Sequence, residues 1–144
     1  MIGIMDPTIW AKAHGATTHF PIALTLGSAC LDAAAWLLAG RPVAHSLRAS
    51  GYWTILIGAA GSVVAVASGL LMTRGSVLGH GALRLHHLFV WPAFGLLIAL
   101  AAWRRLTGDG ATRPASAPYL VAVGVAAGLM LIAGYWGGEM MLSR

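Results

Sequence analysis

Six histidines are the residues of this 144-residue chain that are best suited to chemistry. Five of them, together with the single glutamate, lie near the ends of apolar segments: His14, His19, His80, His86, His87 and Glu139. The neutral imidazole ring binds iron and other transition metals at physiological pH. We therefore consider a metal or haem site first, which requires a fold that brings these side chains together.

Four apolar runs have the length and composition of membrane-spanning helices. The chain is 58% hydrophobic and only 9% charged, with a mean hydropathy of +0.78, whereas a soluble domain carries about 25% charged residues. A span needs about 20 apolar residues, and the four runs cover residues 18–38, 52–73, 83–103 and 118–141. The composition excludes an ordinary soluble enzyme, and the scattered Lys and Arg residues exclude a nucleic-acid-binding surface. The sequence predicts an all-α, four-helix transmembrane bundle that forms one domain in the lipid bilayer.

Short connections make the predicted helices alternate in direction, up-down-up-down. The starts of the first and third helices then meet the ends of the second and fourth. Five histidines and Glu139 are thereby predicted to lie on one side of the membrane, and His45 alone on the other. Ionisable groups in a bilayer are costly and usually functional. The second half is not an evident copy of the first, so the sequence indicates no internal repeat.

His19 and the adjacent pair His86 and His87 are predicted to lie at matched depth on the first and third helices. Neighbouring helices pack 8–10 Å apart, so these diagonal helices lie roughly 14 Å apart and leave room for a macrocycle between two imidazoles. His86 and His87 point about 100° apart, so only one of them faces His19. We expect this to be His87, because it shares a helix face with Arg84 and Trp91, while His86 faces a neighbouring helix, a second ligand or the headgroups. The sequence thus favours a b-type haem with His19 and His87 as axial ligands.

Nearby residues suit the walls and the rim of such a site. Gly27 follows His19 along its helix and leaves a slot for a flat ligand, while Trp91 provides an aromatic wall. Arg84 or Arg74 is placed to pair with the haem propionates at the aqueous edge. The alternative interpretation of the glycines is close contact between helices.

Two other interpretations of the histidines stay open. A non-haem copper, zinc or iron site would use His14, His19, His86 or His87 together with Glu139. A cofactor-free membrane anchor for a partner protein would explain the glycines but not the one-sided histidines. No Ser–His–Asp set, phosphate loop or pair of carboxylates can be assembled, so we expect no enzyme on its own. We expect instead an electron carrier or a subunit of a membrane oxidoreductase, with a quinone, a redox partner protein or a second copy as its partner.

Loop charge predicts the orientation of the chain in the membrane, because cytoplasmic loops carry an excess of Lys and Arg. The first and third connections hold Arg41, Arg48, Arg104, Arg105 and Arg113, and the opposite side holds Lys12, Arg74, Arg84 and Arg144. This bias places the termini and the histidines on the periplasmic side of a bacterial inner membrane.

Asp32 is the one acid deep in the first helix. No basic residue is predicted at comparable depth on another helix. Three roles of this carboxylate stay open. It could accept a hydrogen bond from the backbone or from Ser62, it could be covered by the side chain of Trp36, or it could belong to a proton-transfer path.

Two segments of the chain resemble those of a bacterial family of small four-helix inner-membrane proteins of unknown function. The segments are His14-x4-His19-Phe20-Pro21-Ile22-Ala23-Leu24 and Gly134-Tyr135-Trp136-Gly137-Gly138-Glu139. The resemblance implies that His14, His19 and the Gly-Gly-Glu end belong to one site, and that this site has a redox role. In plan, the chain is also similar to the four-helix b-type cytochromes of membranes, which is an analogy of architecture.

Overall fold

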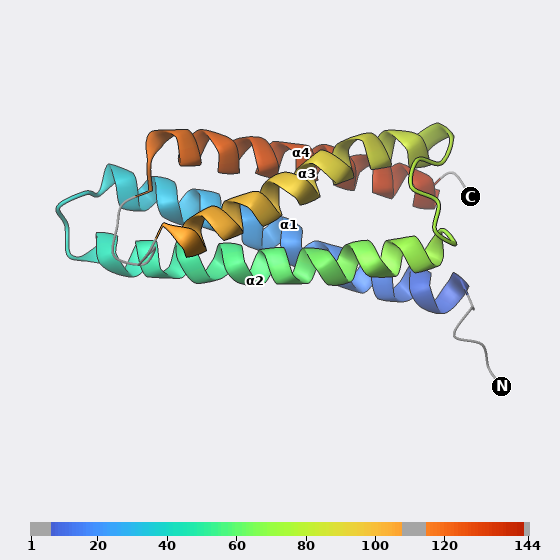
Figure 1. Ribbon diagram of the computed structural model, residues 1–144, viewed down its shortest axis with the longest axis horizontal. Helices are drawn as coiled ribbons and strands as arrows, with labels where there is room; N and C mark the ends of the chain where they lie inside the picture. Colours follow the sequence, from blue (N-terminus) through green and yellow to red (C-terminus); the bar gives the residue numbers. More distant parts are fainter. Residues whose placement is uncertain (1–6, 108–114, 143–144) are drawn as a thin grey trace.

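Four long helices make up nearly all of the chain in the computed structural model, which describes residues 7–107 and 115–142 (Figure 1). The helices are α1 (Pro7–Leu37), α2 (Val43–Met72), α3 (Gly81–Leu106) and α4 (Ala117–Leu142). Each is long and apolar enough to cross a membrane. Within the described ranges there is no strand. The predicted all-α bundle of four transmembrane helices is therefore confirmed, and the protein is a multi-pass membrane protein.

The helices pack as two antiparallel hairpins. α1 contacts α2 extensively and α3 contacts α4 extensively, whereas the hairpins meet through the sparser α1–α4 and α2–α3 contacts. α1 and α3 run in the same direction on a diagonal of the bundle, as the up-down-up-down prediction requires. The start of α1, the α2–α3 connection and the end of α4 lie together at one end, on the right of Figure 1.

The first helix begins at Pro7 and not near residue 18, so the predicted range of 18–38 is wrong at its start. Proline is well tolerated in the first turn of a helix because its missing N–H has no partner there. The added turns are stabilised by packing on α2, where the His14 ring meets the carbonyl of Ala65. His14 therefore lies inside a helix and has a fixed direction, and it does not precede the helix in a loop.

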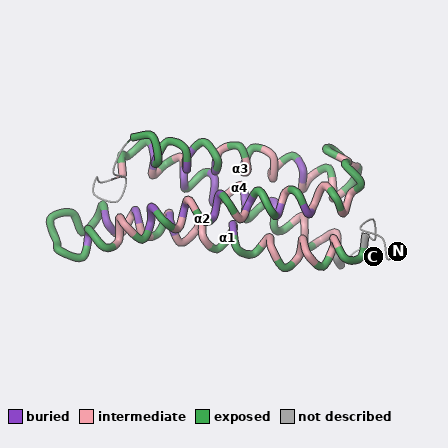
Figure 2. Tube along the Cα trace, turned by 60° about the horizontal axis from the view of Figure 1, so that its bottom comes forward, coloured by how far each residue is buried: buried purple, intermediate pink, exposed green. Residues whose placement is uncertain are grey.

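Packing is tight along the middle of the bundle and at the end that carries the α1–α2 connection, and it is loose at the opposite end (Figure 2). The apolar core consists of Ile55, Ala59, Ala93, Leu97, Leu100, Ala101, Tyr119, Val123, Ala126 and Met130. In the segments 8–20, 66–72, 81–92 and 134–140, which form the loose end, only Ser68 and His87 are buried.

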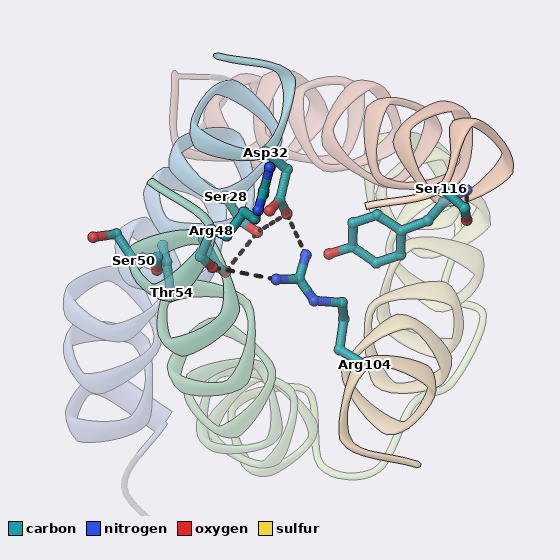
Figure 3. A network of polar contacts seen from close by, with 9 residues as sticks. Ser28, Asp32, Arg48, Ser50, Thr54, Arg104 and Ser116 are labelled. Carbon is teal, nitrogen blue, oxygen red and sulfur yellow. Dashed lines mark hydrogen bonds and ion pairs between the residues drawn. The ribbon is translucent and has the colours of Figure 1, made fainter. Parts of the chain in front are cut away.

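A buried ion pair connects the two hairpins near the tightly packed end. Arg104 of α3 donates from Nη1 to Oδ2 of Asp32 in α1 at 2.7 Å, and both side chains are almost fully buried (Figure 3). Ser28 also donates to Oδ2 at 3.4 Å, and Arg104 donates from Nη2 to the carbonyl of Arg48 at 3.3 Å. The guanidinium lies over the ring of Tyr119, 5.0 Å from its centroid. The pair thus joins groups from all four helices.

The expectation that Asp32 lacks a basic partner is wrong. α3 continues to Leu106, so Arg104 belongs to its last turns and does not lie in the following loop, and the long side chain reaches inward. Ser28 rather than Ser62 bonds the carboxylate, and Trp36 is 53% exposed and does not cover it.

Because Arg104 lies buried in α3 and not in a loop, the excess of basic loop residues that predicted the orientation of the chain in the membrane is lost. Arg113 and Arg144 lie outside the described residues. In the described part, three basic residues remain at each end of the bundle: Arg41, Arg48 and Arg105 at one, and Lys12, Arg74 and Arg84 at the other. Loop charge therefore favours neither side of the membrane.

Replacing Arg104→Leu should destabilise the protein by about 3–5 kcal/mol, because it leaves the carboxylate of Asp32 buried without its partner. Arg105→Leu, at the exposed neighbouring position, is the matched control and should change stability by about 0.5 kcal/mol or less. Unfolding of the purified protein in mixed detergent micelles measures both values. Equal effects of the two substitutions would contradict a stabilising role for the pair.

Candidate functional site

A cavity of about 780 Å³ opens between the two hairpins at the loosely packed end. This volume lies within the range of about 300–1,000 Å³ that is typical of ligand sites. All four helices line it, and most of its walls are apolar or glycine. Five histidines are among the lining residues: His14, His19, His80, His86 and His87. The cavity thus brings together the five histidines that the sequence places at this end.

The ring of His14 is held against α2 by a hydrogen bond and by a glycine. Nδ1 lies 2.8 Å from the carbonyl oxygen of Ala65, and because a carbonyl only accepts, Nδ1 carries the proton. A Cβ atom at Gly69, one turn further along α2, would lie 2.9 Å from Cε1 of this ring. Only glycine therefore leaves space for His14. The other ring nitrogen, Nε2, keeps its lone pair for a ligand.

His86 is held against α4 in the same manner. Its Nδ1 donates to the carbonyl oxygen of Ala133 at 2.7 Å. Gly137 follows Ala133 by four residues, as Gly69 follows Ala65, and a Cβ at Gly137 would lie 3.5 Å from the His86 ring. Each hairpin thus presents one imidazole with Nδ1 bonded to its own partner helix.

His14 and His86 meet across the diagonal of the bundle. Their ring centroids are 6.5 Å apart, and the ring planes are nearly perpendicular, at 86°. A metal ion bound to one nitrogen of each ring at about 2.0–2.1 Å needs those nitrogens about 4 Å apart, and a ring nitrogen lies about 1 Å from its ring centre. A metal ion between the two rings would require both Nε2 atoms to face each other, which the separation of the centroids permits.

His87 is the most enclosed of the five histidines. Its side chain is 6% exposed, and Nδ1 is buried without a hydrogen-bond partner in the described part of the chain. Its ring lies 5.8 Å from that of His86 and 6.0 Å from that of Trp91. Trp91 lines the cavity as predicted, and its Nε1 donates to the carbonyl of Val77 in the α2–α3 connection at 2.8 Å.

The remaining residues of the predicted site fall into two groups. His19 lines the cavity and is exposed. Arg84, Gly27 and Glu139 are not among the described residues that line the cavity. Gly27 packs against Cγ2 of Thr54 at 3.7 Å, which is a helix contact, and Arg84 is exposed. The diagonal ring pair that the structure brings together is thus His14 with His86, whereas the sequence favours His19 with His87.

Sequence reasoning missed the glycines that hold the two rings. The available signal was the spacing Ala-x3-Gly near the end of both even-numbered helices, at Ala65 and Gly69 and again at Ala133 and Gly137. In the described ranges, no group of three or more His, Cys, Asp or Glu side chains is placed to hold a metal ion. The protein part of a metal site here would consist of two imidazoles.

A model of the family described as "Predicted membrane protein (DUF2231)" matches residues 12–144, from just before His14 to the last residue. The chain belongs to this DUF2231 family. No curated protein and no solved structure matches it. The description of DUF2231 gives membrane location without an activity, so the function of this member has to be inferred from its cavity.

Substituting Gly69→Ala should displace the His14 ring, because the new Cβ would lie 2.9 Å from Cε1. Gly137→Ala should be tolerated, because 3.5 Å is an ordinary contact distance. ¹⁵N NMR of the histidine side chains in micelles reads out the Nδ1–H tautomer and its hydrogen bond to the carbonyl.

The matched control for both substitutions is Gly128→Ala, where nothing lies within 4 Å of the added Cβ. We expect a changed His14 signal in the first variant alone. An unchanged His14 signal in Gly69→Ala would show that the glycine is not required to seat the ring.

Proposed function

We propose that this protein is a membrane electron carrier that binds one b-type haem between His14 and His86 in the bacterial cytoplasmic membrane. The observation that carries the proposal is the pair of imidazoles on diagonal helices. Their centroids are 6.5 Å apart at the cavity, and each Nδ1 is bonded to a backbone carbonyl. Haem iron between two such rings is a one-electron carrier.

The hydrogen bonds at Nδ1 support a ligand role for both rings. A histidine that binds a metal generally donates its other N–H to a carbonyl, carboxylate or water, which fixes the tautomer and increases the basicity of the ligating nitrogen. Ala65 and Ala133 supply these carbonyls. Both rings are thereby oriented by their own hairpin before any ligand binds.

The number of protein ligands favours haem over a directly bound metal ion. Zinc sites in proteins use three or four protein ligands, and the described residues offer no group of three. A porphyrin supplies four nitrogens of its own, so two imidazoles complete the coordination of its iron. The apolar wall of the cavity, which includes Trp91, Phe94 and Met130, suits the macrocycle.

The rim of the cavity suits the polar edge of a haem. Thr73, the C-cap residue of α2, and His80, the N-cap residue of α3, line the cavity at this end of the bundle. An imidazole N–H donates a hydrogen bond, which a propionate accepts. Arg84 and Arg74 are exposed nearby and supply positive charge at the same end.

Absorption spectra of the protein purified in detergent from haem-replete cells test the proposal. The reduced-minus-oxidised spectrum should show the α-band of a low-spin b-type haem, and His14→Ala and His86→Ala should each abolish it. His45→Ala, at the opposite end of the bundle, is the control and should keep the band.

The same spectra separate the competing interpretations. Loss of the band in His19→Ala and His87→Ala, with the band kept in His14→Ala, would assign the ligands as the sequence alone favours. Copper, zinc or iron in elemental analysis without a haem band would support the non-haem site. A colourless, metal-free wild type would contradict both.

We further propose that a quinol supplies the electrons and that His19 contacts it. His19 lines the cavity while being exposed inside the span of α1, so a lipid-soluble substrate reaches it from the bilayer. A haem held by His14 and His86 would accept one electron at a time. The two electrons of one quinol would therefore leave in two steps, with reoxidation by a one-electron acceptor protein between them. His19 would take up the first of the two quinol protons and pass it to water, and the second would also leave to water.

His19→Leu should slow reduction of the haem by a short-chain quinol about tenfold, the effect of one lost hydrogen bond of about 1.4 kcal/mol. Stopped-flow absorbance measures this rate, and dithionite, which needs no binding site, is the control reductant. An unchanged rate with quinol would remove His19 from this role.

A further inference from the structure

The ligand pair and the ion pair occupy equivalent positions in the two hairpins. His86 follows His14 by 72 residues, and Arg104 follows Asp32 by the same 72 residues. Both pairs join α1 to α3 across the diagonal, one at each end of the bundle. Because both pairs have the same offset, residue n of α1 and residue n + 72 of α3 lie at equivalent positions in the two hairpins.

Burial follows the same offset between residues 21–32 of α1 and residues 93–104 of α3. The buried residues Pro21, Thr25, Ser28 and Asp32 of α1 correspond to Ala93, Leu97, Leu100 and Arg104 of α3, all of which are buried. The side chains differ in chemistry at each of these positions, although their environment is the same.

The second helices of the two hairpins, α2 and α4, correspond in the same way with an offset of 68 residues. Ala65 and Gly69 of α2 correspond to Ala133 and Gly137 of α4, which hold the two histidine rings. The six buried residues in the described part of α4 are Tyr119, Val123, Ala126, Ala127, Met130 and Ala133. They correspond to Gly51, Ile55, Gly58, Ala59, Ser62 and Ala65 of α2, which are also buried.

The two hairpins are therefore structural repeats related by an approximate two-fold axis along the bundle. Parallel repeats of this kind are known in membrane proteins. In sequence the two halves are still not evident copies of each other, and the similarity is one of burial. The repeat is hidden in the sequence because paired positions carry unlike residues, such as Ser28 with Leu100 and Gly51 with Tyr119.

We propose that Asp32 and Arg104 are positioning residues for the haem ligands: their ion pair fixes the register of α1 against α3. This inference rests on the proposed function. α1 and α3 are rigid helices, each carrying one ligand histidine and one member of the ion pair 18 residues apart, about 27 Å at 1.5 Å per residue. Fixing the register of the two helices at one end therefore fixes the relative height of the two rings at the other.

The chemistry of the interface explains why a charged pair is suited to this task. α1 and α3 do not pack extensively on each other, and the core between the hairpins is made of aliphatic, alanine and tyrosine side chains. Such surfaces allow several registers, whereas a buried pair of unlike charges specifies one. Opposite charges at equivalent positions also favour pairing of the two unlike hairpins over pairing of like ones, in which equal charges would meet.

The double variant Asp32→Leu/Arg104→Met tests the inference. Replacing a buried ion pair by apolar side chains of similar size is often neutral for stability, so this protein should fold and keep its helices while losing the register. In wild type, electron paramagnetic resonance of the ferric protein should show one low-spin species. In the double variant, we expect a mixture of low-spin and high-spin species.

Two further variants exclude a general loss of stability as the cause. Leu100→Ala makes a cavity in the core one turn from Arg104 and should keep the single low-spin species despite its lower stability. Asp32→Asn keeps the shape of the side chain but removes its charge, and it should give the mixed spectrum even where the double variant does not fold. Identical spectra in wild type and both pair variants would overturn the inference.

A distance measurement that needs no haem separates this inference from the proposed function. Spin labels on cysteines at the exposed positions Phe20 in α1 and Leu88 in α3, in a Cys30→Ser background, report the register by double electron–electron resonance. We expect a narrow distance distribution in wild type and a broad one in the double variant. Narrow distributions in both proteins would overturn the register role even if haem binds. A broad distribution in the variant, with no haem in wild type, would retain the register role and refute the proposed function.

Discussion

The ion pair between Asp32 and Arg104 is the interaction on which the arrangement of the two hairpins depends. Lipid tails are as apolar as leucine, so no hydrophobic effect drives one transmembrane hairpin onto another, and close packing and polar contacts have to hold them together. Here small residues bring the helices close within each hairpin, and the ion pair joins the hairpins at one end. A guanidinium and a carboxylate buried in this way tolerate few alternative positions, because separating them would leave two charges in an apolar medium.

The cavity lies at the loosely packed end of the bundle. Aliphatic side chains fill the core near the ion pair, while the other end has glycines and histidines where a filled core would have large apolar residues. Gly69 leaves the space that the His14 ring occupies, whereas Gly137 lies at an ordinary contact distance from the His86 ring. In each hairpin a hydrogen bond from Nδ1 to a carbonyl of the neighbouring helix holds the ring at the cavity. A ligand in this cavity would meet equivalent histidines from the two hairpins. His19 and Trp91, which occupy equivalent positions but differ in chemistry, make the two sides of the cavity different.

Much of the fold followed from the sequence, because apolar length and short connections determine helix number and direction in a bilayer. The alternating direction of the four helices was enough to predict that five histidines lie at one end of the bundle. The pairing of rings did not, because it depends on where α1 starts: with a start near residue 18, His14 belongs to a loop, and only the structure places it in a helix facing Ala65. Arg104 was missed for a similar reason, since one more turn of α3 turns a loop charge into a buried one. The repeat was missed because it is a repeat of burial and not of residue type.

The proposed function requires one haem bound by two imidazoles in the cavity of about 780 Å³. The most direct measurement is a pyridine haemochrome assay on the purified, full-length protein, expressed as haem b per polypeptide. The account predicts one haem b per chain. A ratio near zero from haem-replete cells, in protein whose four helices are intact, would contradict it.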